Sequence, residues 1–511
     1  MRALISVYDK TGVAEFARGL VDLGFEVVSS GGTATSLEEA GLAVTTVEEV
    51  TGFPELLGGR VKTLHPRVHA GILARRGHED DLAAIAEHGI ELFDLVCVNL
   101  YPFELAVDRP ELDEEGLVEM IDVGGPALLR AAAKSFASVL AVCRPQDYAP
   151  VLSELWAGQG ASTPDLRRRL AAVAFARTAA YDSAIARWFQ RAETLPETFV
   201  PAFDRVRELS YGENPHQSAA YYAERGARTH LLSYVEQHQG KPLSFNNLND
   251  LSAARLLAAE LNGPACVIVK HANPCGVAVA ETIEDAYAKA LAADPVSAFG
   301  GVVVLNRPVG EELAGALASQ FVEVLFAPAF HRSALETLSG KESLRILEHT
   351  EQRAVDVGER DYRRVIGGLL VQQRDVGAAA RGEFDVVCGE VTEDRWSDLL
   401  FAWQVVKYVT SNAIVVARDG QTLGIGAGQM SRVDGVRIAI EKARELGHAL
   451  DGAVLASDAF FPFADGPRLA LDAGIRAFIQ PGGSKRDSEV VEAVSSAGAT
   501  MVLTGQRHFR H

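Results

Sequence analysis

The chain has 511 residues, of which 48% are hydrophobic and 23% charged, so it has enough core material for roughly three or four globular domains. Its formal net charge of −19 argues against a nucleic-acid partner and against anionic membrane surfaces, and no apolar stretch approaches membrane-spanning length. The N-terminus enters a strand-like segment instead of a signal peptide, and the five cysteines form no CxxC pair, so we expect reduced thiols in the cytoplasm.

Two strand-turn-helix units open the chain. Residues 3–7 have the pattern of a buried strand, and a polar turn with Lys10 connects them to a helical pattern. Residues 25–28 are again strand-like and are followed by the turn SSGGT at 29–33 and a predicted helix at 34–40. One such turn is more often a plain connection, but two turns at adjacent parallel strands direct N–H groups and hydroxyls at one anion. With Lys10 beside them, the pair favours a phosphate site.

A basic segment at 58–69 reads GGRVKTLHPRVH and stands out in this acidic chain. Its cations suit an anionic ligand, although a solvated basic loop is the alternative. A predicted strand at 92–100 ends next to Tyr101, and the segment IDVGGP precedes a helix that carries Lys134. A tyrosine in that place is more often a packing residue, and an exposed lysine is more often solvated.

The second half of the chain contains an internal repeat. Thr163-Pro164 caps a long helix, and the acidic, proline-containing stretch 192–203 then reads as the linker between two halves. Beyond the linker, the order helix, strand, polar loop, helix, strand is predicted twice. The first copy has strands at 265–269 and 302–305 with a helix at 283–291, and the second has strands at 413–417 and 453–456 with helices at 399–409 and 436–446.

The strand at 265–269 ends in the sequence KHANPCG, which presents polar chemistry where a strand meets a loop. His271 is suited to take a proton near neutral pH and Lys270 to hold negative charge, as attack by a weak nucleophile requires. A solvated surface loop explains this pair equally well. In the second copy, GIGAGQ at 424–429 reads as a glycine-rich turn, and the aromatic run at 460–463 is either core or the wall of a cleft.

Taken together, these motifs resemble the bifunctional purine biosynthesis enzymes that join phosphoribosylaminoimidazolecarboxamide formyltransferase to IMP cyclohydrolase. The resemblance extends from the first strand to the tail and rests on SSGGT, GRVKTLHPRVHAG, NLYPF, IDVGGPALLRAAAK, YGENPHQ, KHANPCG, SNAI, GIGAGQ and SDAFFPF. It implies formyl transfer from 10-formyltetrahydrofolate to aminoimidazole carboxamide ribotide (AICAR). The formylated product (FAICAR) then undergoes dehydrative ring closure to IMP.

The resemblance also implies an α/β architecture. A methylglyoxal-synthase-like, doubly wound parallel sheet is expected at 1–195, and a formyltransferase region at 196–511 with two cytidine-deaminase-like α/β subdomains, at about 200–385 and 386–511. It further implies a cytoplasmic homodimer that binds AICAR, FAICAR and folate but no nucleic acid or membrane. No metal is expected, because His349-Thr350-Glu351 lacks the PCxxC partner of the zinc deaminases.

The family's functional residues map onto both halves. For ring closure, the resemblance implies substrate contacts from Lys10, Ser30, Gly31, Gly32, Thr33, Arg60 and Thr63, and catalytic roles for Lys62, Tyr101, Asp122 and the proton donor Lys134. For formyl transfer, it implies catalytic roles for Lys270, His271 and Asn412, substrate contacts from Tyr211, Gly300, Glu323 and Arg507, and folate contacts from Phe460 and Asp465.

Two positions depart from the family pattern. Ser210 stands where an arginine usually binds substrate phosphate, and Gly466 stands where some relatives have asparagine. Arg205, Arg207 or Arg507 are the candidates to replace the missing arginine.

Two other functions are compatible with parts of the sequence. A sugar-phosphate lyase resembling methylglyoxal synthase, fused to a domain of separate purpose, would turn over dihydroxyacetone phosphate without folate. A nucleotide-sensing protein would bind a purine nucleotide in the N-terminal phosphate pocket and form no product.

Overall fold

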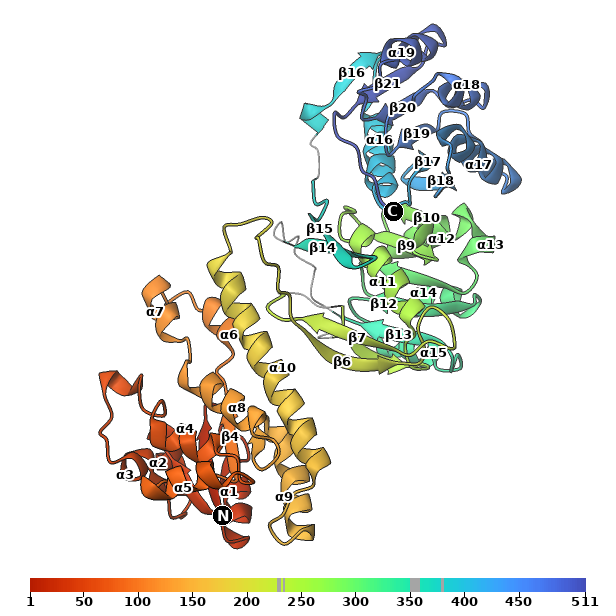
Figure 1. Cartoon of the computed structure of the whole chain (residues 1–511). Coiled ribbons are helices and arrows are strands. Elements are labelled where there is room, and N and C mark those ends of the chain that lie inside the picture. Colours follow the sequence, from red (N-terminus) through yellow and green to blue (C-terminus); the bar gives the residue numbers. More distant parts are fainter. Residues whose placement is uncertain (228–230, 233–234, 350–358, 378–380) are drawn as a thin grey trace. The chain divides into compact units, whose positions relative to one another are not determined.

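The computed structural model describes residues 1–511 except 228–230, 233–234, 350–358 and 378–380 (Figure 1). Two compact units make up the chain: unit 1 comprises Met1–Asp204 and Glu224–Ala227, and unit 2 comprises Arg205–Ala223 and Arg228–His511. Of the segment compared with the zinc deaminases, Thr350 and Glu351 lie outside the described residues. Within the described ranges, no helix combines the length and the apolar character that crossing a bilayer requires.

Unit 1 is built on a parallel five-stranded sheet in the order β3-β2-β1-β4-β5. Leu4 packs on one face of this sheet and its neighbours Ala3 and Ile5 pack on the other, each within a separate apolar cluster that includes helical residues. The predicted doubly wound parallel sheet is therefore confirmed. Its strands are β1 (Arg2–Val7), β2 (Glu26–Ser29), β3 (Thr45–Thr46), β4 (Leu95–Asn99) and β5 (Leu140–Val142).

The helices of unit 1 cover both faces of this sheet. They are α1 (Val13–Asp22), α2 (Gly31–Glu39), α3 (Val47–Thr51), α4 (Pro66–Leu73), α5 (Glu79–Glu87), α6 (Phe103–Val107), α7 (Glu114–Glu119), α8 (Gly124–Lys134), α9 (Tyr148–Ala157) and α10 (Pro164–Phe189). The predicted cap of the long helix α10 is confirmed, since the Thr163 hydroxyl accepts the N–H of Leu166 at 3.2 Å. The strand order reverses at β1, so the carboxyl ends of β1 and β4 open a crevice suited to a ligand.

Unit 2 contains a mixed sheet of 12 strands in the order β16-β21-β20-β19-β17-β18-β10-β9-β11-β12-β13-β8. This order is symmetric about the antiparallel contact between β10 and β18, so two copies of one αβ unit share a sheet. The predicted internal repeat is confirmed, and each copy is longer than predicted. The strands are β8 (Glu236–Gln239), β9 (Ala265–Lys270), β10 (Asn273–Val279), β11 (Gly301–Leu305), β12 (Val322–Ala327), β13 (Arg345–Glu348), β16 (Asp385–Cys388), β17 (Ile414–Arg418), β18 (Gln421–Gly426), β19 (Val454–Ser457), β20 (Ala477–Gln480) and β21 (Thr500–Leu503).

Helices flank this sheet in both copies, five in the first and four in the second among the described residues. They are α11 (Phe245–Ala258), α12 (Ile283–Ala293), α13 (Pro295–Ala298), α14 (Glu311–Ala318) and α15 (Arg332–Leu338), then α16 (Glu393–Val406), α17 (Arg432–Glu445), α18 (Asp465–Asp472) and α19 (Asp487–Ser496). Two separate two-stranded sheets are also present: β6 (Phe203–Leu209) pairs with β7 (Ala219–Glu224), and β14 (Arg360–Val365) pairs antiparallel with β15 (Gly368–Gln373).

The expectation of a polar loop after the strand at 265–269 is wrong. Lys270 pairs with Asn273 across an antiparallel ladder, so His271 and Ala272 form a two-residue turn between β9 and β10. The equivalent turn joins β17 and β18, where Arg418 pairs with Gln421. Periodicity within the sequence detects the first strand but not the partner that continues it, because strand pairing is a tertiary contact.

The prediction of a glycine-rich turn at 424–429 is also wrong for the first half of this segment. Gly424 and Gly426 lie inside β18. A Cβ on Gly424 would stand 2.0 Å from the carbonyl oxygen of Ala439 in α17, and one on Gly426 would stand 2.0 Å from that of Gly435. These glycines permit a helix to approach a strand closely. In the sequence, glycines that serve this packing have the same pattern as the glycines of a turn.

The C-terminal tail packs against unit 2. His508 is 2% exposed, and its Nδ1 lies 2.6 Å from Asp375 Oδ2. Arg510 Nη1 donates to the carbonyl oxygen of Tyr408 at 2.9 Å, and the Arg510 carbonyl accepts the N–H of Ser411 at 2.8 Å. These contacts hold the tail in an ordered position against its own chain.

Candidate active sites

The N-terminus of α2 forms the centre of the first candidate site. Ser30 is the N-cap residue, and its side chain makes no capping hydrogen bond. Gly31 follows with a φ of +51°, which favours glycine. A Cβ on Gly31 would lie 3.0 Å from Lys62 Nζ, and one on Gly32 would lie 3.9 Å from Lys10 Nζ. Two ammonium groups therefore stand close to the free N–H groups of a helix start, an arrangement that attracts phosphate.

Side-chain hydrogen bonds to the backbone hold these turns in place. The Thr33 hydroxyl accepts the N–H of Val7 at 3.0 Å and donates to the Val7 carbonyl at 2.9 Å. Asn99 Oδ1 accepts the N–H groups of Tyr8 and Asp9 at 2.7 and 2.9 Å. Thr33 thus fixes α2 to the end of β1, and Asn99 fixes the turn that leads to Lys10.

The basic segment contributes Lys62 and Thr63 to this site. Lys62 Nζ also lies 2.8 Å from Glu55 Oε2. Thr63 Oγ1 would stand 2.8 Å from a Cβ on Gly124, so the hydroxyl contacts the start of α8. Arg60, by contrast, forms an ion pair with Glu119, and 64% of its side chain is exposed.

Asp122 lies at the start of α8, beside Thr63. Its Oδ1 accepts the N–H of Gly125 at 2.8 Å, and its own N–H donates to the Tyr181 hydroxyl at 2.7 Å. Burial raises the pKa of Asp122 above its ordinary value, while hydrogen bonds from two glycine N–H groups act in the opposite direction. Tyr101 is buried, and its hydroxyl has no hydrogen-bond partner among the described residues. These properties suit groups that handle protons.

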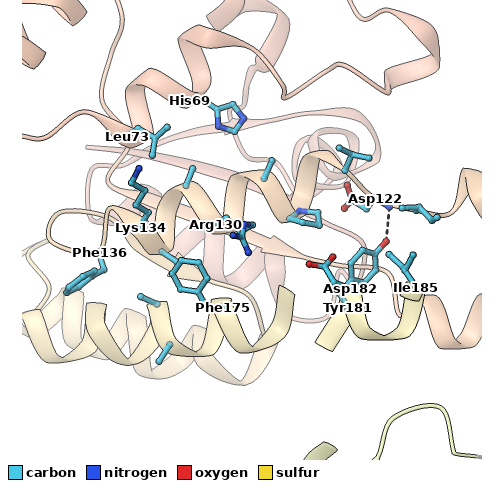
Figure 2. Close-up of a pocket in the computed structure, with 18 of the residues that line it drawn as sticks. His69, Leu73, Asp122, Arg130, Lys134, Phe136, Phe175, Tyr181, Asp182 and Ile185 are labelled. Atoms are coloured by element: carbon cyan, nitrogen blue, oxygen red, sulfur yellow. Dashed lines mark hydrogen bonds between the residues drawn. The ribbon is translucent and has the colours of Figure 1, made fainter. Parts of the chain in front are cut away.

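A cavity of about 1080 Å³ runs along α8 between residues of α4 and α10 (Figure 2). Asp122 and Lys134 both line it, but from opposite ends of α8, roughly 18 Å apart at the helical rise per residue. His69 also faces the cavity, and burial lowers the pKa of its imidazole. The structure therefore brings Lys10, Lys62 and the start of α8 into one region but leaves Lys134 apart from Asp122.

The second candidate site is built on the turn between β9 and β10. Lys270 Nζ donates to the carbonyl oxygens of Gly300 at 2.8 Å and Phe299 at 3.1 Å. Gly300 has a φ of +67°, and a Cβ there would stand 3.2 Å from Lys270 Nζ, so glycine leaves room for the ammonium group. His271 is exposed and lines a cavity of about 280 Å³ together with Lys270. Lys270, His271 and Gly300 are thus brought together.

Both copies of the repeat line this cavity. Lys442 of α17 lies 2.5 Å from Asp294 Oδ2, and Ser297 Oγ lies 3.2 Å from the same ammonium nitrogen. Burial raises the pKa of Cys275 to about 12, so its thiol stays protonated and is a poor nucleophile. The cavity therefore offers cations and an imidazole, but no activated thiol.

Asn412 belongs to a buried polar network in the second copy. Its Oδ1 accepts from Arg432 Nη2 at 2.7 Å, and its Nδ2 donates to the Gln429 carbonyl at 2.8 Å. Arg432 also donates to Ser457 Oγ at 2.8 Å and forms an ion pair with Asp458. Sequence reasoning missed Arg432. The available signal was a single arginine shortly after GIGAGQ, which has no distinctive spacing.

Tyr211 and Glu323 both contact the start of α11. The Tyr211 carbonyl accepts the N–H of Phe245 at 3.3 Å, and Glu323 Oε2 accepts from Asn247 Nδ2 at 2.9 Å. Ser244 and Asn247 form a capping box at the start of this helix.

The predicted folate residues lie at and after the end of β19. Phe460 is half-buried, and Asp465 is exposed at the first position of α18. Of the aromatic run, Phe461 belongs to the core, while Phe463 is 49% exposed. A Cβ on Gly466 would lie 3.1 Å from the Phe461 ring, so this departure from the family pattern accompanies close packing. Arg507 is exposed, with its guanidinium carbon 4.6 Å from the centre of the Phe509 ring.

Comparison with known proteins gives two family matches. Residues 132–442 match the family described as AICARFT/IMPCHase bienzyme, and residues 12–127 match the family described as MGS-like domain. A solved structure titled "Crystal structure of ForH" is similar at 43% identity, covering 37% of this chain and 98% of that chain, with a TM-score of 0.35.

Proposed function

The chain belongs to the AICARFT/IMPCHase bienzyme family, and from this premise we propose that unit 1 performs ring closure and unit 2 performs formyl transfer. The family catalyses the last two steps of IMP synthesis, with a formyl-folate as cosubstrate. Its match begins in unit 1 and ends in unit 2, which argues against a lyase fused to an unrelated domain. One observation supports this assignment of the two activities to the two units: the candidate site residues form two separate polar sites, one in each unit.

For ring closure, the substrate phosphate would bind at the start of α2, between Lys10 and Lys62. An amide nitrogen of FAICAR then attacks the formyl carbon of the same molecule, and water is lost as the ring forms. Because both reacting groups belong to one molecule, orientation supplies much of the rate. Asp122 and Tyr101 are the groups assigned to proton transfer, since Asp122 lies half-buried beside Thr63 and Tyr101 is buried.

Lys134 has a different role in this proposal. Because it lies at the far end of α8 from Asp122, it faces the long cavity instead of the phosphate-binding turn. Its ammonium group would attract anionic substrate toward the site, and direct proton donation would need a substrate that extends along the cavity.

For formyl transfer, the weakly nucleophilic AICAR amine attacks the formyl carbon of 10-formyltetrahydrofolate. His271 takes the proton that the amine loses as the new C–N bond forms, and the bond from the formyl carbon to folate N10 breaks. Lys270 stabilises negative charge on the formyl oxygen. Gly300, Asn412, Tyr211, Glu323 and Arg507 are assigned to the substrate, and Phe460 and Asp465 to folate.

We also assign a cytoplasmic homodimer to this protein, without nucleic-acid or membrane partners. The support is the acidic net charge of −19, the five free cysteines and an exposed apolar edge on the β14–β15 hairpin, formed by Val365, Ile366, Leu369 and Leu370. Light scattering behind a size-exclusion column tests the dimer, and a monomer at micromolar concentration would contradict it.

The main experiment supplies the purified protein with AICAR and 10-formyltetrahydrofolate and follows tetrahydrofolate and IMP together. His271→Ala is expected to lose formyl transfer and to retain ring closure when FAICAR is supplied directly. Lys10→Met is the converse variant, with weakened ring closure and normal formyl transfer. Loss of both activities in either single variant would contradict the division between the units.

A further inference from the structure

The turn that carries His271 is conformationally unfavourable for its sequence. His271 and Ala272 have φ values of +52° and +60°, in the left-handed region, which few residues other than glycine adopt and which alanine adopts less readily than asparagine, aspartate or histidine. Two-residue turns of this kind strongly prefer Asn-Gly or Asp-Gly. The turn at the candidate site must therefore be held by contacts outside its own two residues.

Asp250 of α11 supplies such contacts. Its Oδ1 accepts the N–H of Ala272 at 2.7 Å, and its Oδ2 accepts the N–H of His271 at 3.3 Å. The carboxylate thus binds both residues of the turn from the helix side. On the other side, Asn273 Nδ2 donates to the His271 carbonyl at 3.3 Å, while its Oδ1 accepts the N–H of Thr410 at 2.9 Å.

In the second copy of the repeat, an aspartate makes the equivalent pair of hydrogen bonds. Asp398 of α16 accepts the N–H of Asp419 at 3.0 Å and the N–H of Gly420 at 2.9 Å, in the turn between β17 and β18. That turn has the favoured Asp-Gly sequence. The duplication therefore offers an internal comparison: an identical carboxylate clamp holds an ordinary turn in one copy and the histidine turn in the other.

We propose that Asp250 is a positioning residue for formyl transfer, which holds the His271–Ala272 turn so that the imidazole faces the cavity beside Lys270. This inference rests on the proposed role of His271 as the base. A base must lie within hydrogen-bond reach of the proton that it removes, and a displacement of about 1 Å is enough to lower a rate roughly 100-fold. Without the clamp, the turn can relax toward backbone conformations that histidine and alanine prefer, and the imidazole moves with it.

The test compares Asp250→Ala and Asp250→Asn with the matched variants Asp398→Ala and Asp398→Asn. Steady-state kcat and KM are measured for formyl transfer, and ring closure of supplied FAICAR reports that unit 1 is intact. We expect Asp250→Ala to lower kcat for formyl transfer roughly 100-fold with KM little changed, and Asp250→Asn to lower it less because one acceptor remains. The Asp398 variants should keep kcat within about twofold, although they remove the same number of hydrogen bonds.

A double-mutant comparison separates positioning from general stabilisation. If Asp250 acts through His271, then Asp250→Ala lowers the residual rate of His271→Ala little further. The proposal is overturned if Asp250→Ala retains normal kcat or if the Asp398 variants lose as much kcat as the Asp250 variants. It is also overturned if Asp250→Ala lowers the rate of His271→Ala by the same factor as it lowers the rate of the native protein. If His271→Ala itself retains formyl transfer, the assigned base is wrong, and that result is distinct from normal kcat in the Asp250 variants alone.

Discussion

Replacing Arg432 with methionine should strongly destabilise unit 2. The Arg432 side chain is 7% exposed and its partner Asp458 is 0% exposed, so neither charge is solvated. The guanidinium also donates to Ser457 and Asn412 at 2.8 and 2.7 Å. Methionine fills a similar volume but leaves the Asp458 carboxylate buried, with the Ser411 hydroxyl as its remaining side-chain partner among the described residues.

The expected size follows from the cost of an uncompensated buried charge. Removing one partner of a buried ion pair typically lowers the free energy of unfolding by about 3–5 kcal/mol. For a unit of about 300 residues, the entropy of unfolding converts this into a fall in melting temperature of about 5–8 °C. Asn412 also loses the donor that orients its amide, so formyl transfer should decrease at temperatures where unit 2 is still folded.

The control is Arg437→Met, on the same helix. Arg437 pairs with Asp434 at the surface, where half of its side chain is exposed, and such pairs contribute about 0.5 kcal/mol. Both variants are followed by calorimetry and by the loss of each activity after brief heating. Ring closure serves as the reference because its candidate site lies in unit 1. A shift of less than about 1 °C for Arg432→Met, or equal shifts for the two variants, would refute the reasoning.

Three further outcomes are expected. Asp122→Asn should lower ring closure yet leave the protein as stable or more stable at pH 7. Burial raises the folded-state pKa of Asp122, so ionisation of this carboxyl lowers the stability of the native protein as pH rises above about 4. The melting temperature, measured as a function of pH, should therefore fall less over this range in Asp122→Asn. The same fall in the variant and the native protein would contradict a raised pKa. Lys62→Met should raise KM for FAICAR about tenfold, as loss of a charge-assisted contact predicts, and an unaltered KM would remove Lys62 from the phosphate site. Gly424→Ala should destabilise the protein by about 1–3 kcal/mol because its Cβ meets Ala439, whereas Gly315→Ala, which has open space in α14, should be neutral or stabilising in the same denaturation assay.

The sequence by itself determined the class of fold, the repeat and the family. Local patterns were sufficient where the controlling contact lies within a few residues. The Thr163 cap and the strand at 3–7 are of this kind, because a helix start or a buried strand is set by its own side chains. The long motifs identified the family for the same reason, since many residues in fixed order specify it jointly.

Only the tertiary structure decided how the site residues meet. Gly424 is a strand residue because α17 passes over it, and the KHANPCG segment is a hairpin because β10 pairs with β9. Lys134 lies far from Asp122 because the 11 residues of helix α8 separate them, whereas Asp250 reaches the His271 turn although they are 21 positions apart in sequence. Hydrogen bonds and packing across a sheet depend on which elements become neighbours, and sequence spacing carries no direct record of that choice.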